Sequence, residues 1–200
     1  EIGDIQIVQL MSKMTNIMSE GEVFQLMKCG DTSLTEAEYL SIVEKKTAVL
    51  ISAACGSGAV LGGAAQTQTE ALEQYGYKIG MAFQITDDTL DYMAKEEDFG
   101  KSIGKDLEEG KMTLPLIYTL AKCTQPERDK IKTTIEHKTF SPDAIKDIFA
   151  LIQKSGGIDY SLKRAEQFIR EAQAGLEVFA DCSEKDPLRT VAEYIISRKI

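Results

Sequence analysis

Apolar residues recur at helical spacing along almost the whole chain, and no run of alternating apolar and polar residues persists as strands would require. The first segment carries two apolar stripes, one made of Ile5, Val8, Met11, Met14 and Met18, the other of Ile7, Leu10 and Ile17. A helix that is apolar over so much of its circumference is buried on two sides. We therefore expect this helix to lie inside a bundle or at a contact between subunits.

Residues typical of helix ends divide the remaining chain. Thr35 and Glu38 have the spacing of a capping box, in which each side chain satisfies a free backbone N–H group of the other. Gly156 closes the helix before it, and residues 160–179 read as another long amphipathic helix. All four prolines stand where helices begin or connect, at Pro115, Pro126, Pro142 and Pro187. The sequence predicts one all-α domain over residues 1–200.

Residues 47–69 carry no charge, which is long enough to raise the question of a membrane span. Four glycines and several serines, threonines and glutamines lower the mean hydropathy of this stretch. A buried helix followed by a tight connection fits it better, so we expect no transmembrane segment.

Composition narrows the classes of ligand. Lys and Arg number 23 against 32 Asp and Glu, and the net charge of −9 has the wrong sign for a general nucleic-acid binder. A phosphate-bearing ligand must therefore be met by a few local cations or by metal ions. The cysteines are scattered and lack C-x-x-C spacing: Cys29, Cys55, Cys123 and Cys182. We expect them to be reduced, small core residues of a cytoplasmic protein.

One cluster of aspartates carries the most informative chemistry. Asp87 and Asp91 are four residues apart and share a helix face, with Asp88 beside them. Carboxylates about 5–6 Å apart repel by roughly 3 kcal/mol at an effective dielectric constant near 20. Mg²⁺ resolves this repulsion, because it takes one or two carboxylates and accepts further ligands from substrate phosphates. For these three residues alone, a hydrated acidic surface remains an alternative.

Lysines follow the aspartates on a glycine-punctuated loop at residues 100–113. Lys101, Lys105 and Lys111 can supply positive charge to phosphate oxygens, so that aspartates with a metal and lysines together form a diphosphate clamp. Lys46 and Thr47 form a second candidate, since they precede an apolar stretch and could stand at the polar end of an apolar cavity. The alternative for Lys46 is a surface lysine paired with Glu44 or Glu38.

These motifs, taken in order, resemble the C-terminal two thirds of trans-isoprenyl diphosphate synthases, and most closely the octaprenyl-type enzymes. The matching pieces are Glu20-Gly21-Glu22 with Gln25, Tyr39, Lys46-Thr47-Ala48, Gly80 with Ala82-Phe83-Gln84, Asp87-Asp88 with Asp91-Tyr92, Gly100-Lys101, Gly104 with Asp106-Leu107, Gly110-Lys111 with Thr113-Leu114-Pro115, Arg164-Ala165 and Ala172. Each piece alone is weak, but the ordered combination is specific and covers nearly the whole chain.

The resemblance implies an isoprenoid-synthase-type helical bundle and a role for each candidate residue. Asp87 is expected to bind Mg²⁺ directly or through water, supported by Asp88 and Asp91 in an aspartate-rich motif. The resemblance also assigns the allylic diphosphate to Lys46, Lys101 and Lys111. Thr47 and Gln84 are expected to face the developing allylic cation and to orient the departing diphosphate.

The implied activity is condensation of an allylic prenyl diphosphate with isopentenyl diphosphate to give a long-chain all-trans polyprenyl diphosphate, by a cytoplasmic homodimer whose contact uses the first helix. The sequence departs from the family pattern because it lacks the first aspartate-rich motif and the earlier Gly-Gly-Lys-type segment. We therefore expect the chain to be a fragment, inactive by itself. The alternative is a non-catalytic synthase-like subunit that modulates a complete enzyme, although such a subunit has no need of the retained aspartates and lysines.

Two other sites are weaker. A di-iron bundle needs Glu-x-x-His pairs, and the chain has one histidine, His137, which we expect at the surface. A dinucleotide site at Gly56 and Gly58 lacks the preceding strand that this motif requires.

Overall fold

A computed structural model of the chain describes residues 3–93 and 104–198, and in these ranges the chain is helical without any strand. The predicted all-α fold is confirmed. The elements are α1 (Ile5–Met27), α2 (Glu36–Val43), the π-helical turn η1 (Glu44–Ala48), α3 (Val49–Leu61), α4 (Gln66–Leu90), α5 (Lys105–Glu108), α6 (Leu114–Lys122), α7 (Gln125–Glu136), α8 (Pro142–Ser155), α9 (Gly157–Gly175), the 3₁₀ turn η3 (Leu176–Val178) and α10 (Lys185–Ser197).

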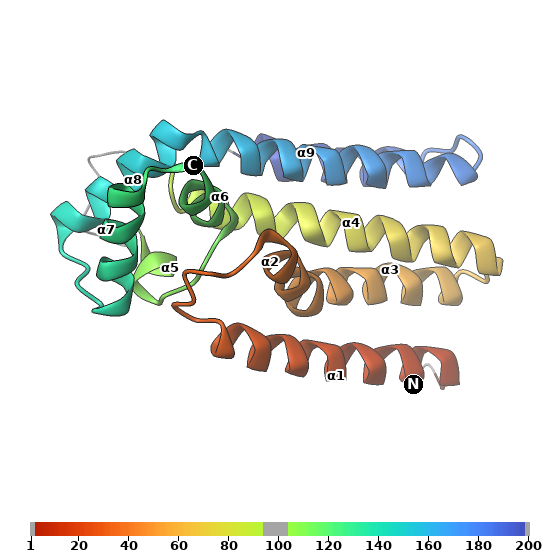
Figure 1. Cartoon of the computed structure of the whole chain (residues 1–200). Helices are drawn as coiled ribbons and strands as arrows, with labels where there is room; N and C mark the ends of the chain where they lie inside the picture. Colours follow the sequence, from red (N-terminus) through yellow and green to blue (C-terminus); the bar gives the residue numbers. More distant parts are fainter. Residues whose placement is uncertain (1–2, 94–103, 199–200) are drawn as a thin grey trace.

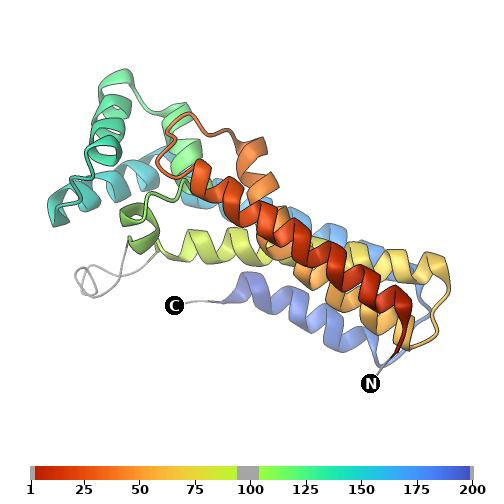
Figure 2. The same ribbon diagram turned by 90° about the horizontal axis from the view of Figure 1, so that it is seen from below.

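The long helices α1, α3, α4 and α9 run side by side, and the shorter helices α5 to α8 gather at one end of them (Figure 1). Helix α4 is the centre of the arrangement, because it packs extensively against α3 on one side and α9 on the other. Figure 2 shows α1 crossing the outside of the bundle, with α10 beside the long helices. The carboxyl end of α4 thus lies where the long helices meet the cluster of short ones.

Glycines on α4 allow η1 and α3 to approach it closely. A Cβ atom at Gly80 would lie 2.5 Å from the Cα atom of Ala48, and one at Gly76 would lie 2.6 Å from the carbonyl oxygen of Ile51. Only glycine fits such contacts without moving backbone. The result is that Lys46 and Thr47, in η1, are held directly against α4.

The helix boundaries follow the sequence signals. Thr35 Oγ1 accepts a hydrogen bond of 3.2 Å from the Glu38 N–H group, and Glu38 Oε2 accepts one of 2.9 Å from the Thr35 N–H group, which confirms the capping box. Gly156 ends α8 with a φ of 78°, a left-handed conformation that glycine adopts easily. The prolines stand in the first turns of α6, α7, α8 and α10.

A second capping box predicts a pH dependence of stability. Hydrogen bonds from Lys154 on α8, and from Thr124 at the start of α7, hold the pKa of Glu127 at about 2, below its usual 4.5. A lowered folded-state pKa stabilises the fold above the unfolded pKa, and this stabilisation is lost as pH falls from about 4.5 to about 2. Glu127→Gln should therefore lower the melting temperature at pH 7.

The difference in melting temperature between Glu127→Gln and the wild type should shrink as pH falls from about 4.5 to about 2. Thermal melts followed by circular dichroism at several pH values would measure it. Glu136→Gln on the same helix is the control, because Glu136 is exposed and takes no part in the cap. A pH-independent difference between wild type and Glu127→Gln would contradict the electrostatic explanation.

Helix α1 corrects one expectation. Met14 and Gly21 are its buried residues, whereas Ile5, Leu26 and Met27 are between 65% and 76% exposed. The prediction that this helix lies inside the bundle is wrong for this chain, because α1 packs one side on α3 and η1 at the edge of the bundle. Its second apolar side has no cover from the described residues.

The uncharged stretch, residues 47–69, takes in the end of η1, helix α3, a short turn and the start of α4. Helix α3 buries a face of small residues, Ala53, Gly56 and Ala59, so the expected buried helix is only partly enclosed. Across the described ranges, no helix is both long enough and apolar enough to pass through a membrane.

The expectation that the cysteines are core residues is wrong for Cys29 and Cys182, whose free thiols belong to exposed residues.

Candidate active site

A cavity of about 370 Å³ lies where the carboxyl end of α4 meets α2, η1, the end of α1 and the segment after α5. One part of its lining is apolar and includes Leu34, Tyr39, Ile42, Val43 and Met112. The other part is charged or polar and includes Lys28, Lys46, Gln84, Asp87, Asp88, Asp106, Glu109 and Lys111. An apolar pocket with a few convergent polar groups is the usual form of a small-molecule site.

The three aspartates of the motif occupy different environments. Asp87 lines the cavity with 55% of its side chain exposed. Asp88 is buried, and its oxygens accept hydrogen bonds of 2.6 Å from Tyr39 Oη and 2.8 Å from Gln84 Nε2. Asp91 caps the end of α4 and accepts a 3.4 Å bond from the backbone N–H group of Asp106. Asp91 stands outside the lining of the cavity.

Negative charge is crowded at this end of α4. Burial raises the pKa of Asp88 to about 7, and the charges of Asp106 and Asp87 raise it as well, against the lowering effect of its two hydrogen bonds. Burial likewise raises the pKa of Asp91, with a further increase from Asp106. A cation placed among these carboxylates would relieve their repulsion.

The carboxylates at this end of α4 fit a hard divalent cation that is also bound by phosphate oxygens of a ligand. In the part of the chain that the structure describes, no three acidic, histidine or cysteine side chains converge closely enough to hold a metal by themselves. Mg²⁺ does not require such a cage, since it binds through one or two carboxylates together with phosphate oxygens and water. Asp87, exposed to the cavity, offers a carboxylate of this kind.

Two of the predicted lysines reach the cavity, each already paired with acidic side chains. Lys46 Nζ lies 3.2 Å from Glu22 of α1, rather than pairing with Glu44 or Glu38. Lys111 Nζ lies 2.6 Å from Asp106 and 2.9 Å from Glu109. Partial burial lowers the pKa of Lys111, but these hydrogen bonds outweigh it, so that the pKa is raised overall.

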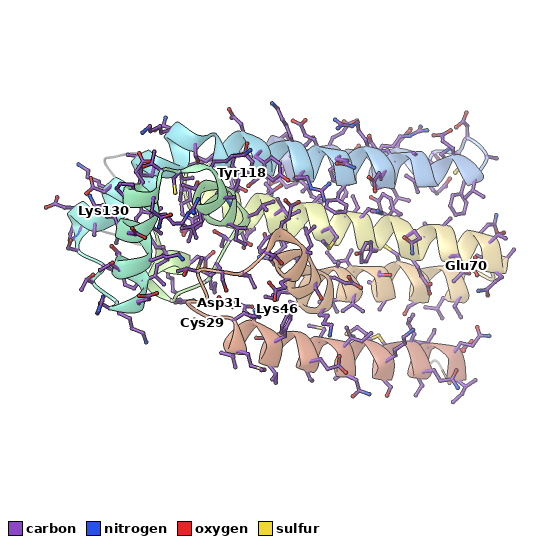
Figure 3. All side chains as sticks on the ribbon, in the orientation of Figure 1. Cys29, Asp31, Lys46, Glu70, Tyr118 and Lys130 are labelled. Atoms are coloured by element: carbon purple, nitrogen blue, oxygen red, sulfur yellow. The ribbon has the colours of Figure 1, made fainter. Side chains whose placement is uncertain are left out.

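The side-chain view shows Lys46 between α2 and α1, near Cys29 and Asp31, whereas Glu70 lies at the opposite end of α4 (Figure 3). Lys105 stands outside the cavity lining. Its side chain is 70% exposed, and its Nζ atom lies 3.7 Å from Glu109 Oε1. Lys101 lies outside the described residues. The structure thus brings Lys46 and Lys111 to the lining of the same cavity.

Thr47 and Gln84 are brought together as a pair. Thr47 Oγ1 donates a 2.7 Å hydrogen bond to Gln84 Oε1, across the close contact between η1 and α4. Gln84 lines the cavity, and Thr47 stands behind it. Gln84 is therefore the member of the pair that can meet a ligand directly.

Sequence reasoning gave no role to four residues at the site. Lys28 lines the cavity and pairs with Asp31 at 3.0 Å and Glu38 at 2.9 Å. The guanidinium of Arg198 stacks 4.5 Å from the centre of the Phe83 ring and lies 3.9 Å from Asp87. Asp106 and Tyr39 are the other two. The motif around Asp106 could have indicated that residue, but no local signal marks Arg198, which reaches the site only through folding.

The chain is similar to known prenyl diphosphate synthases. Octaprenyl diphosphate synthase of Escherichia coli is 34% identical over 197 residues, which cover 98% of this chain and 61% of that protein. A geranylgeranyl diphosphate synthase of Methanosarcina mazei is 38% identical over 196 residues, 98% of this chain and 58% of that protein. The chain thus spans about three fifths of the length of these relatives.

A crystal structure of a polyprenyl synthase from Caulobacter crescentus, complexed with calcium and isoprenyl diphosphate, superposes with a TM-score of 0.93 at 34% identity. That match covers 100% of this chain and 61% of the other. The polyprenyl synthetase family matches residues 1–152. With three quarters of its length matched to that family and its helices superposing on a solved member, the chain belongs to the polyprenyl synthetases.

Proposed function

We propose that this chain supplies the allylic-diphosphate site of a trans-polyprenyl diphosphate synthase, the enzyme that joins an allylic prenyl diphosphate to isopentenyl diphosphate. The observation that carries this proposal is the cavity in which Asp87, Lys46 and Lys111 meet an apolar wall. A prenyl diphosphate has the matching form, with a highly charged head and a hydrocarbon tail. Membership of the family and the related synthases support the same activity.

Each group has a task in this reaction. Lys46 and Lys111 exchange their carboxylate partners for diphosphate oxygens, and Asp87, with Asp88 and Asp91 in support, holds Mg²⁺. The bound Mg²⁺ would neutralise charge that develops on the leaving diphosphate. Apolar side chains from α2 exclude water that would otherwise capture the allylic cation. The electron-rich Oε1 atom of Gln84, oriented by Thr47, stabilises that cation.

The 200-residue chain contains one Asp-Asp-x-x-Asp, at residues 87–91, and spans 61% of the Escherichia coli relative. We propose that the chain alone binds the allylic substrate but does not carry out the condensation, because one aspartate-rich motif supplies only half of the metal site that the condensation uses. The likeness to an octaprenyl synthase supports a long-chain product for the whole enzyme.

We further propose that residues 1–200 form a single domain of a cytoplasmic homodimer. The exposed apolar side of α1, with Ile5 at 65% and Val8 at 59% exposure, supports a subunit contact on this helix. Burial of such a side against a second copy would remove apolar surface from water, which favours association.

Calorimetric titration with farnesyl S-thiolodiphosphate, an allylic diphosphate analogue that resists ionisation, tests the proposed site. Two neighbouring lysines supply the variant and its control. The wild-type chain should bind this analogue in the presence of Mg²⁺. Lys46→Ala should weaken binding by about 10- to 100-fold, because a hydrogen bond to a charged group contributes about 1.5–3 kcal/mol. Lys45→Ala is the matched control, since Lys45 pairs with Glu20 at 3.3 Å outside the cavity.

Lys45→Ala should leave the affinity within about twofold of the wild type, since it removes the same charge from the adjacent position. No binding by the wild-type chain, or equal losses in both variants, would contradict the proposed function.

A further inference from the structure

Four side chains at the site form one continuous series of hydrogen bonds. Tyr39 Oη on α2 donates to Asp88 Oδ2 at 2.6 Å, and Asp88 Oδ1 accepts from Gln84 Nε2 at 2.8 Å within α4. Gln84 Oε1 in turn accepts from Thr47 Oγ1 of η1 at 2.7 Å. The series joins three elements and includes Gln84, the residue that we place beside the allylic cation.

The chemistry of the members fixes the direction of each bond. While Asp88 is ionised, its carboxylate can only accept hydrogen bonds, so Gln84 turns its amide nitrogen toward Asp88. Its carbonyl oxygen then faces the other way, where the hydroxyl of Thr47 donates to it. Asp88 therefore decides which end of the Gln84 amide is presented on the Thr47 side.

Tyr39 completes the arrangement by holding Asp88 in place. Both residues are buried, with relative exposures of 3% for Tyr39 and 8% for Asp88. Each oxygen of Asp88 accepts a hydrogen bond from a protein donor, so the series holds its carboxylate in a fixed orientation. Asp87, with 55% of its side chain exposed, takes no part in this series and faces the cavity.

We propose that Asp88 and Tyr39 are positioning residues, which act on the allylic substrate by fixing the orientation of Gln84. This inference rests on the proposed function of the same cavity. The two aspartates then have different roles: Asp87 binds the metal ion, and Asp88 orients the side-chain amide of Gln84.

The orientation of Gln84 can be followed by nuclear magnetic resonance of its side-chain amide in ¹⁵N-labelled protein, with Gln84→Glu used to assign the signals. Tyr39→Phe leaves Asp88 with an unpaired oxygen, so the carboxylate turns toward water and releases Gln84. Solvent exchange of the Gln84 amide protons should rise about tenfold or more. Unchanged exchange in Tyr39→Phe would overturn the positioning role.

Tyr75→Phe is the matched control, because Tyr75 is also 3% exposed on α4 and its hydroxyl donates a 2.7 Å bond to the Leu188 carbonyl oxygen. It should leave Gln84 exchange within about twofold of the wild type. Asp88→Asn gives a second route if Tyr39→Phe does not fold. An asparagine offers a single acceptor oxygen for Tyr39 and Gln84, so exchange at Gln84 should rise here too, and no rise would again overturn the role.

Mn²⁺ titrations with inorganic diphosphate, followed by electron paramagnetic resonance, separate positioning from ligation. Asp87→Asn should weaken Mn²⁺ binding by roughly a hundredfold or more, as expected for loss of a ligand, and Asp88→Asn should weaken it by only about tenfold, as expected for a residue that supports one. Equal losses would overturn the division between the two aspartates. Absence of Mn²⁺ binding in the wild type would reject the proposed function instead, and Gln84 exchange would then decide the positioning role alone.

Discussion

Asp87→Asn is expected to weaken Mg²⁺-dependent binding of an allylic diphosphate analogue by roughly a hundredfold or more. Loss of a residue that only supports a metal ligand costs about 10- to 100-fold, so loss of a ligand should reach or exceed that range. The change preserves the size of the side chain and removes the charge that Asp87 presents to the cavity. Calorimetric titrations with and without Mg²⁺ would measure the effect.

The stability of the fold should hardly change in this variant. The contact between Asp87 and Arg198, at 3.9 Å, is partly exposed, and ion pairs of that kind contribute about 0–1 kcal/mol. Asp159→Asn serves as the control because Asp159 is an exposed aspartate in the first turn of α9. If Asp87→Asn binds the analogue as tightly as this control in the presence of Mg²⁺, Asp87 does not hold the metal.

Spacing along one helix predicted the location of the acidic motif, because residues four apart on α4 must share a face. The separate roles of its members could not be read in the same way. Asp88 is turned inward by Tyr39, which lies 49 residues earlier in the chain, and that contact exists only after α2 packs against α4. Helical periodicity marks Tyr39 only as an aromatic residue of an apolar helix face, and its place in the family resemblance gave it no role beside Asp88.

The lysines show the same limit. The sequence placed Lys46 beside an apolar stretch, and the structure places it in the lining of the cavity. Its acidic partner is Glu22, on a helix that the local pattern did not connect to it. Arg198 comes to Asp87 from the other end of the chain. Helical periodicity predicted α1 as a helix, but no pattern within it shows that one of its apolar sides is left exposed among the described residues.

Gly80→Ala should destabilise the fold more than Glu127→Gln or Asp87→Asn, by about 3 kcal/mol in the free energy of unfolding. The added Cβ atom would lie 2.5 Å from Ala48 Cα, where the obstacle is backbone and cannot rotate away. Helix α4 and η1 would have to separate. The hydrogen bond between Thr47 and Gln84 spans this contact, so analogue binding should weaken together with stability.

Urea unfolding at equilibrium measures the first effect, and Gly58→Ala is its control. Gly58 also lies inside a helix, α3, but nothing approaches within 4 Å of its added Cβ atom. Alanine favours the helix over glycine by about 0.5–1 kcal/mol, so this variant should be slightly more stable than the wild type. Gly58→Ala and Gly80→Ala should therefore change the free energy of unfolding in opposite directions. The substitution is the same, and only the contact of the added Cβ atom differs. A Gly80→Ala variant as stable as Gly58→Ala would mean that η1 does not press against α4, and the placement of Lys46 and Thr47 at the cavity would lose its structural basis.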